Sequence, residues 1–126
     1  MIVTDASLIV DALIGNSVAL ARLSSEELVA PALLDAEVCG TIRRLALRAD
    51  LDERLAEAAV SDFLELELRR ADQVPLIPRA WELRYTVSFA DALYVALAEQ
   101  LNAPLVTLDA ELAGAPGIFA TVEVVH

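Results

Sequence analysis

Short apolar runs along the chain alternate with longer segments in which apolar residues recur at helical spacing. The short runs predict strands at residues 2–4, 28–30, 64–68, 104–108 and 121–125. The longer segments predict helices at residues 8–13, 17–23, 31–48, 52–63, 80–85 and 88–101. Because strands and helices alternate, we predict a three-layer α/β fold, with a mostly parallel central sheet flanked by helices. A chain of 126 residues is expected to form one domain, spanning 1–126.

Local signals mark several ends of these elements. Ser7 can cap the first helix and Gly15 can end it. Pro31 suits the first turn of the third helix, because proline is favoured at the first helical position. The run at 64–68 alternates strictly between leucine and glutamate, which predicts a half-exposed strand. Trp81 is expected to anchor the short helix that contains it.

The predicted helix at 88–101 is apolar on most sides, since leucine and alanine dominate it. Asp91 interrupts this pattern with a charge, and burying an unpaired charge is costly. One explanation is a capping box, in which Ser88 is the helix cap and Asp91 is the acidic residue three positions later. The other explanation is a functional carboxylate that the fold keeps at a site.

Three further acids occupy comparable positions. Asp5 follows the strand at 2–4, and Asp109 follows the strand at 104–108. Ligands of open α/β sheets bind at the carboxyl ends of the strands, although Asp5 could also simply cap a helix. Glu37 lies on the apolar side of its helix, whereas Asp35 points the other way. We therefore expect Asp5, Glu37, Asp91 and Asp109 to converge on one rim.

The chain offers few other groups for catalysis. It has no lysine, and His126 is its only histidine, so histidine-based acid–base chemistry and zinc sites are improbable. Four carboxylates form a hard oxygen site suited to Mg²⁺ or Mn²⁺, which can support phosphodiester hydrolysis. Ser7 and Thr107 are placed to orient a carboxylate or a water, and Arg44 could reach a phosphate near Glu37.

Composition limits the remaining choices. The net charge of −11 argues against binding nucleic acid through bulk charge. A hydrophobic content of 57% suggests surface reserved for a partner or a second copy of the chain. No apolar run approaches the ~18–20 residues of a membrane span, and the start lacks the basic region of a signal peptide. The single Cys39 excludes an internal disulfide, so we expect a cytoplasmic protein without membrane contact.

Four segments together resemble a known family. They are Thr4-Asp5-Ala-Ser7, Pro31-Ala-Leu-Leu-Asp-Ala-Glu37, Ser88-Phe-Ala-Asp91-Ala-Leu-Tyr-Val-Ala-Leu-Ala-Glu99 and Leu105-Val-Thr107-Leu-Asp109. In this order and at this spacing they resemble the successive motifs of PIN-domain ribonucleases, and most nearly those of the VapC-type toxins of bacterial toxin–antitoxin pairs. The resemblance covers essentially the whole chain. Ala90 departs from it, since the family often has tyrosine just before the third acid, and this concerns local packing.

The resemblance implies a PIN-like fold and an endoribonuclease that depends on Mg²⁺ or Mn²⁺, with RNA as the substrate. It implies that Asp5, Glu37, Asp91 and Asp109 form the catalytic, metal-binding site. It also implies a homodimer held inactive by a cognate VapB-type antitoxin whose tail crosses the site. DNA would be contacted only indirectly, through the antitoxin. The acidity of the chain suits a basic antitoxin tail, and RNA would be admitted locally by arginines and metal.

Three other functional classes share some of these features. A phosphoacceptor receiver domain has a similar length and similar strand-end aspartates, but it needs a lysine that this chain lacks. A nuclease of the same fold without an antitoxin is one alternative. A PIN-like scaffold that binds a partner without catalysis is the other.

Overall fold

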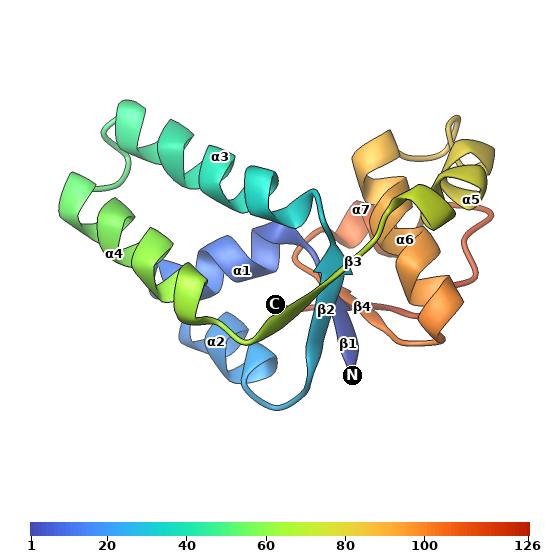
Figure 1. Ribbon diagram of the computed structural model, residues 1–126, viewed down its shortest axis with the longest axis horizontal. Helices are drawn as coiled ribbons and strands as arrows, with labels where there is room; N and C mark the ends of the chain where they lie inside the picture. The colour runs from blue at the N-terminus through green and yellow to red at the C-terminus, as the bar shows by residue number, and fades with distance from the viewer.

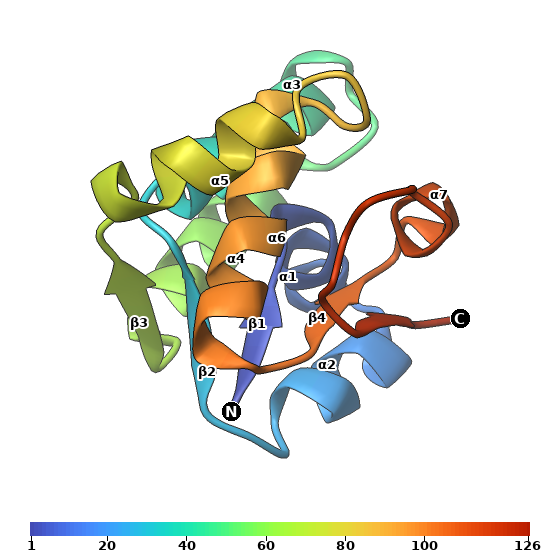
Figure 2. The ribbon, with the colours of Figure 1, turned by 90° about the vertical axis from the view of Figure 1, so that its right-hand side faces the viewer.

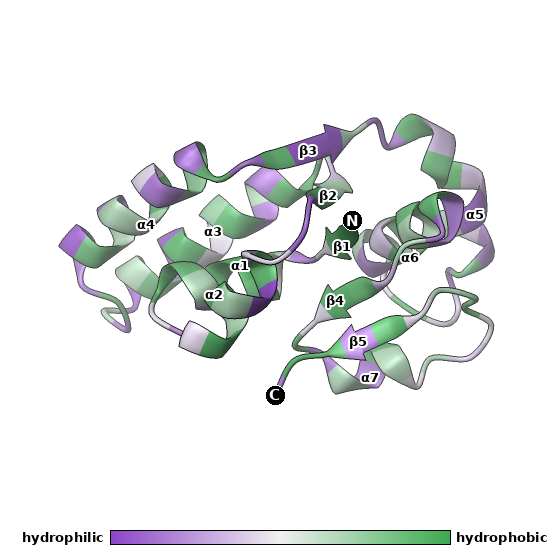
Figure 3. Cartoon of the chain, turned by 90° about the horizontal axis from the view of Figure 1, so that it is seen from below, coloured by the Kyte–Doolittle hydropathy of each residue, from purple (hydrophilic) through white to green (hydrophobic).

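A five-stranded sheet in the order β3-β2-β1-β4-β5 forms the centre of the computed structural model, which describes residues 1–126. The strands are β1 (Ile2–Thr4), β2 (Leu28–Pro31), β3 (Leu68–Ala71), β4 (Leu105–Thr107) and β5 (Val122–Val124). Every neighbouring pair runs parallel, so all five carboxyl ends lie at one edge of the sheet. In Figure 3 the central strands β1 and β4 are coloured as hydrophobic and the edge strand β3 as largely hydrophilic.

Helices cover both faces of this sheet, which confirms the predicted three-layer α/β fold. They are α1 (Ala6–Leu13), α2 (Ser17–Leu23), α3 (Leu34–Leu47), α4 (Glu53–Glu65), the 3₁₀ helix η1 (Val74–Leu76), α5 (Ile77–Glu82), α6 (Phe89–Leu101) and α7 (Ala110–Ala113). Figure 1 shows α1 to α4 on one side of the strands and α5 and α6 on the other. No single helix is long and apolar enough to cross a membrane, and α1 and α2 reach such a length only together, across a bend of 120°.

Helix α6 is the most buried helix of the fold. Every residue from 92 to 98 is buried, because small alanines on several sides allow close packing against β1 and β2. Ser88 caps it, with its hydroxyl oxygen accepting from the backbone N–H of Asp91 at 3.2 Å. Asn102 ends it in a left-handed conformation with φ of 50°. The predicted helix and its Ser88 cap are therefore confirmed, but the capping box is incomplete, because the Asp91 carboxylate accepts no hydrogen bond from the Ser88 N–H.

Helix α4 is longer than predicted, and the strand predicted at 64–68 is wrong in its position. The helical phase of Ala56, Ala59 and Phe63, all buried, continues through Glu65, so Leu64 is a helical residue and 77% exposed. Strand β3 begins only at Leu68. A five-residue alternation is too short to distinguish a strand from the exposed end of a helix.

Two predicted helix starts are also wrong. Pro31 closes β2 instead of opening a helix, and α3 begins at Leu34. The N–H of Ala32 donates to the carbonyl of Ala71 at 3.2 Å, so the sheet continues past the proline without needing an N–H from it. The short helix α5 starts earlier than predicted, and Trp81 is 58% exposed, so it does not anchor α5 to the core.

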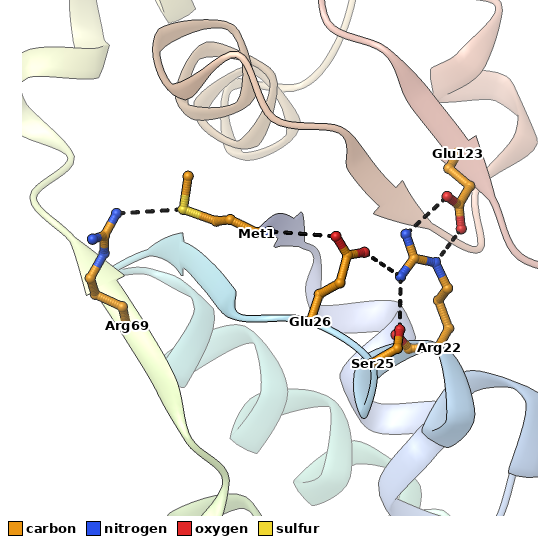
Figure 4. Close-up of polar contacts among 6 residues, drawn as sticks. All are labelled: Met1, Arg22, Ser25, Glu26, Arg69 and Glu123. Atoms are coloured by element: carbon orange, nitrogen blue, oxygen red, sulfur yellow. Dashed lines mark hydrogen bonds and ion pairs between the residues drawn. The ribbon is translucent and has the colours of Figure 1, made fainter.

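A polar network fastens the edge strand β5 to the opposite end of the chain (Figure 4). Arg22 on α2 donates to Glu123 on β5 at 3.0 Å and to Glu26 at 2.7 Å. Glu26 also accepts from the amino group of Met1 at 3.4 Å. The contact between Arg22 and Glu123 joins residues that lie 101 positions apart in the sequence.

Candidate active site

Asp5 is the most buried acid of the predicted site. It follows β1 directly and caps α1, with its Oδ1 accepting from the backbone N–H of Leu8 at 3.1 Å. The Ser7 hydroxyl donates to the same oxygen at 2.8 Å. The prediction that Ser7 caps α1 is therefore wrong, because the cap is Asp5 itself. Ser7 instead helps to hold the carboxylate, which is only 9% exposed.

Thr107 contacts the other carboxylate oxygen of Asp5. Its hydroxyl donates a short hydrogen bond to Asp5 Oδ2 and accepts from the backbone N–H of Asp109 at 3.0 Å. Thr107 ends β4, which pairs with β1, so the sheet register places the two side chains side by side. Since donors hold both of its oxygens, the Asp5 carboxylate has a fixed orientation.

Asp91 lies in the first turn of α6 and is half-buried. Burial raises the pKa of its carboxyl above the ordinary 3.8, a contact with Ser88 opposes this, and the negative charges of Asp109 and Asp5 raise the pKa further. Asp109 is exposed and caps α7, a short helix that we did not predict. Asp91, Asp109 and Ser88 line one cavity of about 410 Å³.

Glu37 reaches the site from α3, on the other side of the sheet from α6. Its Oε1 accepts a hydrogen bond of 2.6 Å from the hydroxyl of Tyr94, a buried residue one turn after Asp91. Burial, the hydrogen bond to Glu37 and nearby negative charges all raise the pKa of Tyr94, so its phenol remains a neutral donor. We did not predict this role, although a tyrosine hydroxyl in an otherwise apolar helix was a signal for it.

The predicted arginine contacts the preceding turn of α3, and its reach to a phosphate near Glu37 stays a prediction. Arg44 donates to the hydroxyl of Thr41 at 3.0 Å, and Thr41 donates to the backbone carbonyl of Glu37, not to its carboxylate. Arg44 is exposed on the flank of α3. Asp35 points away from the acids, as predicted, and pairs with Arg70 on β3 at 2.8 Å.

Comparison with known proteins identifies the family. The model of the PIN domain matches residues 2–118. The chain belongs to the PIN-domain family. It is 43% identical to ribonuclease VapC1 of Mycobacterium tuberculosis, over 98% of this chain and 97% of that protein. It is 41% identical to ribonuclease VapC12 of the same organism, over 99% of both chains. Within the PIN-domain family, the chain is thus a VapC-type ribonuclease, and the resemblance noted in its motifs is confirmed.

Solved structures share the fold of this PIN domain. VapBC2 from Rickettsia felis, bound to a DNA fragment from its promoter, aligns over the full length of both chains with a TM-score of 0.74 and 16% identity. A toxin–antitoxin complex from Klebsiella pneumoniae aligns over 98% of this chain and 100% of that chain, with a TM-score of 0.66 and 21% identity. At this level of identity, the similarity establishes the fold alone.

The chemistry of the PIN-domain site suits a divalent cation. Its donors are carboxylate oxygens from four separate elements, and the negative charges of Asp109 and Asp5 both act on Asp91. As the side chains stand, no group of three or more acidic, histidine or cysteine residues is arranged to hold one metal ion. The fit to Mg²⁺ or Mn²⁺ rests on the chemistry of the donors, because hard cations prefer carboxylate oxygens.

Proposed function

We propose that this PIN-domain protein is an endoribonuclease toxin that hydrolyses RNA phosphodiester bonds with Mg²⁺ or Mn²⁺. The observation that carries the proposal is the gathering of acids at the carboxyl edge of the sheet. Asp91 and Asp109 line one cavity, and the charge of Asp5 acts on Asp91 from the neighbouring strand end. Such mutual repulsion destabilises a protein unless a bound cation offsets it. Asp5, Asp91, Glu37 and Asp109 would hold that cation.

Hydrogen bonds within the chain orient two of the four carboxylates. Ser7, Leu8 and Thr107 orient the Asp5 carboxylate, and Tyr94 orients that of Glu37. A divalent cation bound there would activate water and neutralise charge on the scissile phosphate. The half-buried Asp91 and the exposed Asp109 leave the cavity open to an RNA strand.

The test is RNA cleavage by the purified protein, measured with Mg²⁺, with Mn²⁺ and with chelator. We expect cleavage with either metal, none with chelator, and a loss of orders of magnitude in Asp91→Asn, because a lost ligand removes both water activation and charge neutralisation. Asp62→Asn is the matched control, since Asp62 is an exposed aspartate on α4 that lines no cavity with the acids of the proposed site. Undiminished cleavage in chelator, or by Asp91→Asn, would refute the proposal.

The proposal extends to partners and location. Two of the solved neighbours are a toxin–antitoxin complex and VapBC2, and this supports a VapB-type antitoxin as the inhibitor. A basic antitoxin segment would be attracted to a chain with a net charge of −11. Any contact with DNA would be made by the antitoxin, and a cytoplasmic location would give the proposed enzyme access to cellular RNA.

Exposed apolar side chains support a homodimer. Leu47 at the end of α3 is 70% exposed, and Leu55 on α4 is 60% exposed. Co-expression with the neighbouring reading frame, followed by light scattering of the purified complex, tests both interactions. A strictly monomeric chain that captures no product of that reading frame would contradict them.

A further inference from the structure

Arg84 lies against two exposed aromatic rings at the end of α5. Its guanidinium carbon is 4.9 Å from the centroid of the Trp81 ring and 4.7 Å from that of Tyr85. One guanidinium nitrogen donates to the backbone carbonyl of Trp81 at 2.9 Å, which holds the side chain in this position. Tyr85 is 89% exposed, so its ring presents a flat apolar face to solvent. We call these three residues the aromatic–arginine cluster.

Arg84 differs from the other arginines that contact aromatic rings. Every ion pair made by an arginine uses Arg22, Arg70 or Arg79, so the charge of Arg84 is not neutralised by a carboxylate. Arg79 is the informative comparison. It lies 4.9 Å from the ring of Phe119, but Glu99 and Glu82 neutralise it. In a chain this acidic, an unpaired cation is a local attraction for a phosphate.

The aromatic–arginine cluster directly precedes, along the chain, residues that line the acidic cavity. Thr86 and Val87 follow Tyr85 directly, and both line the cavity together with Asp91 and Asp109. Figure 2 shows α5 packed across α6, whose first turn carries Asp91. A strand of RNA with its phosphate at the acids would therefore extend a neighbouring nucleotide toward the cluster.

We propose that Trp81, Arg84 and Tyr85 form a stacking surface for an unpaired base of single-stranded RNA, beside the scissile phosphate. The proposal rests on the proposed ribonuclease function and specifies its substrate class. Unstacked RNA bases stack on aromatic rings and on arginine planes, and each base has a face that suits such a surface. The guanidinium supplies the positive charge that the acidic cavity lacks. Duplex RNA keeps its bases stacked, so it gains nothing from the cluster.

The experiment measures binding of fluorescent oligouridylate to the full-length protein in chelator, so that no cleavage occurs. Alanine at Trp81 or Tyr85 is expected to weaken binding by about 5- to 150-fold, since base–aromatic stacking contributes about 1–3 kcal/mol per base. Tyr85→Phe keeps the ring and should bind more tightly than Tyr85→Ala. Arg84→Gln should weaken binding and reduce its dependence on salt by about one phosphate contact. All three side chains are exposed, so the variants are expected to fold.

Phe119→Ala is the matched control, because it also removes an exposed ring that contacts an arginine. That arginine, Arg79, is neutralised by carboxylates, and Phe119 lines a different cavity together with Glu99. It should bind oligouridylate like the parent. The proposal is overturned if Trp81→Ala and Tyr85→Ala bind oligouridylate like the parent. It is also overturned if these variants lose as much affinity for duplex RNA as for oligouridylate. A third contrary result is that the variants bind RNA weakly only because their dimer has dissociated, as measured by light scattering. The surface would then join two copies of the chain.

The two proposals fail in different ways. A parent protein that binds oligouridylate through the cluster but cleaves no RNA with Mg²⁺ or Mn²⁺ contradicts the proposed function alone. A parent that cleaves RNA but whose Tyr85→Ala variant binds it normally contradicts the stacking surface alone. A parent that neither binds oligouridylate nor cleaves RNA with Mg²⁺ or Mn²⁺ contradicts both.

Discussion

Tyr94 on α6 donates a 2.6 Å hydrogen bond to Glu37 on α3, and this bond connects the two layers that flank the sheet. The two residues lie 57 positions apart in the sequence. The tyrosine ring is buried, whereas the glutamate is only partly so, which leaves one carboxylate oxygen for another ligand. Tyr94 therefore acts as a positioning residue for an acid of the proposed site.

Removing this hydroxyl should weaken the site while the ring continues to fill the core. We expect Tyr94→Phe to lower Mn²⁺ affinity and cleavage by about 10- to 100-fold, the usual effect of losing the partner of a metal ligand. Calorimetric titration with Mn²⁺ measures the affinity. In a Glu37→Gln background the same change should add little, because the residue through which it acts is already altered. Fully additive losses would show that Tyr94 acts independently of Glu37.

The Thr107 hydroxyl forms hydrogen bonds with the Asp5 carboxylate and with the backbone N–H of Asp109. Thr107→Val keeps the side-chain shape but leaves Asp5 Oδ2 and the N–H of Asp109 without their partner. Because the site is buried, we expect the free energy of unfolding to fall by about 1–3 kcal/mol, together with a loss of cleavage. Thr121→Val is the control, since Thr121 is exposed. Denaturant unfolding of the three proteins measures the difference, and equal stability would refute the supporting role.

Asp91 and Asp5 should respond oppositely to replacement by the amide. The raised pKa of Asp91 means that its ionised form is disfavoured in the folded state, so Asp91→Asn should stabilise metal-free protein at neutral pH. Asp5→Asn should destabilise it by about 1–3 kcal/mol, because an amide N–H₂ then faces the hydroxyl donor of Thr107.

Thermal unfolding in chelator and in Mn²⁺ tests this contrast. Mn²⁺ at a hundredfold excess over its dissociation constant should stabilise the parent by about 2.7 kcal/mol, and Asp91→Asn by much less. If Asp91→Asn were less stable than the parent in chelator, the charge of Asp91 would stabilise the metal-free fold. It would then not be a repulsive charge that a bound metal offsets.

Glu99 should make the protein sensitive to acid. Burial opposes its ionisation, but hydrogen bonds from Arg79 and from the N–H of Phe119 outweigh burial and hold its pKa below the ordinary 4.5. Its stabilising contribution is therefore complete above pH 4.5 and is lost as the pH falls through the lowered folded-state pKa. Glu99→Gln should cost about 1.5–3 kcal/mol at pH 7, and the difference from the parent should shrink below pH 4.5. A difference that stays constant with pH, in urea unfolding, would contradict this account.

Much of the fold followed from local pattern. The apolar repeat of α6, with Ser88 before it and Asn102 after it, was sufficient to locate the helix, because helix propensity and caps depend on neighbours in the chain. The strand expected at 64–68 was misplaced, because Leu64 belongs to a helix whose phase is set by Ala59 and Phe63 packing into the core. The short helix α7 was missed, since four residues carry too little periodicity to be recognised.

The sequence by itself determined which acids follow strands and begin helices, and the motifs they form were sufficient to recognise the PIN-domain family. Only the tertiary structure decided what holds those acids. Thr107 meets Asp5 across 102 residues because β4 pairs with β1, and Tyr94 meets Glu37 because α6 and α3 approach the same edge of the sheet. Local pattern follows from steric and hydrogen-bonding preferences of adjacent residues, whereas these contacts depend on strand order and on packing between layers.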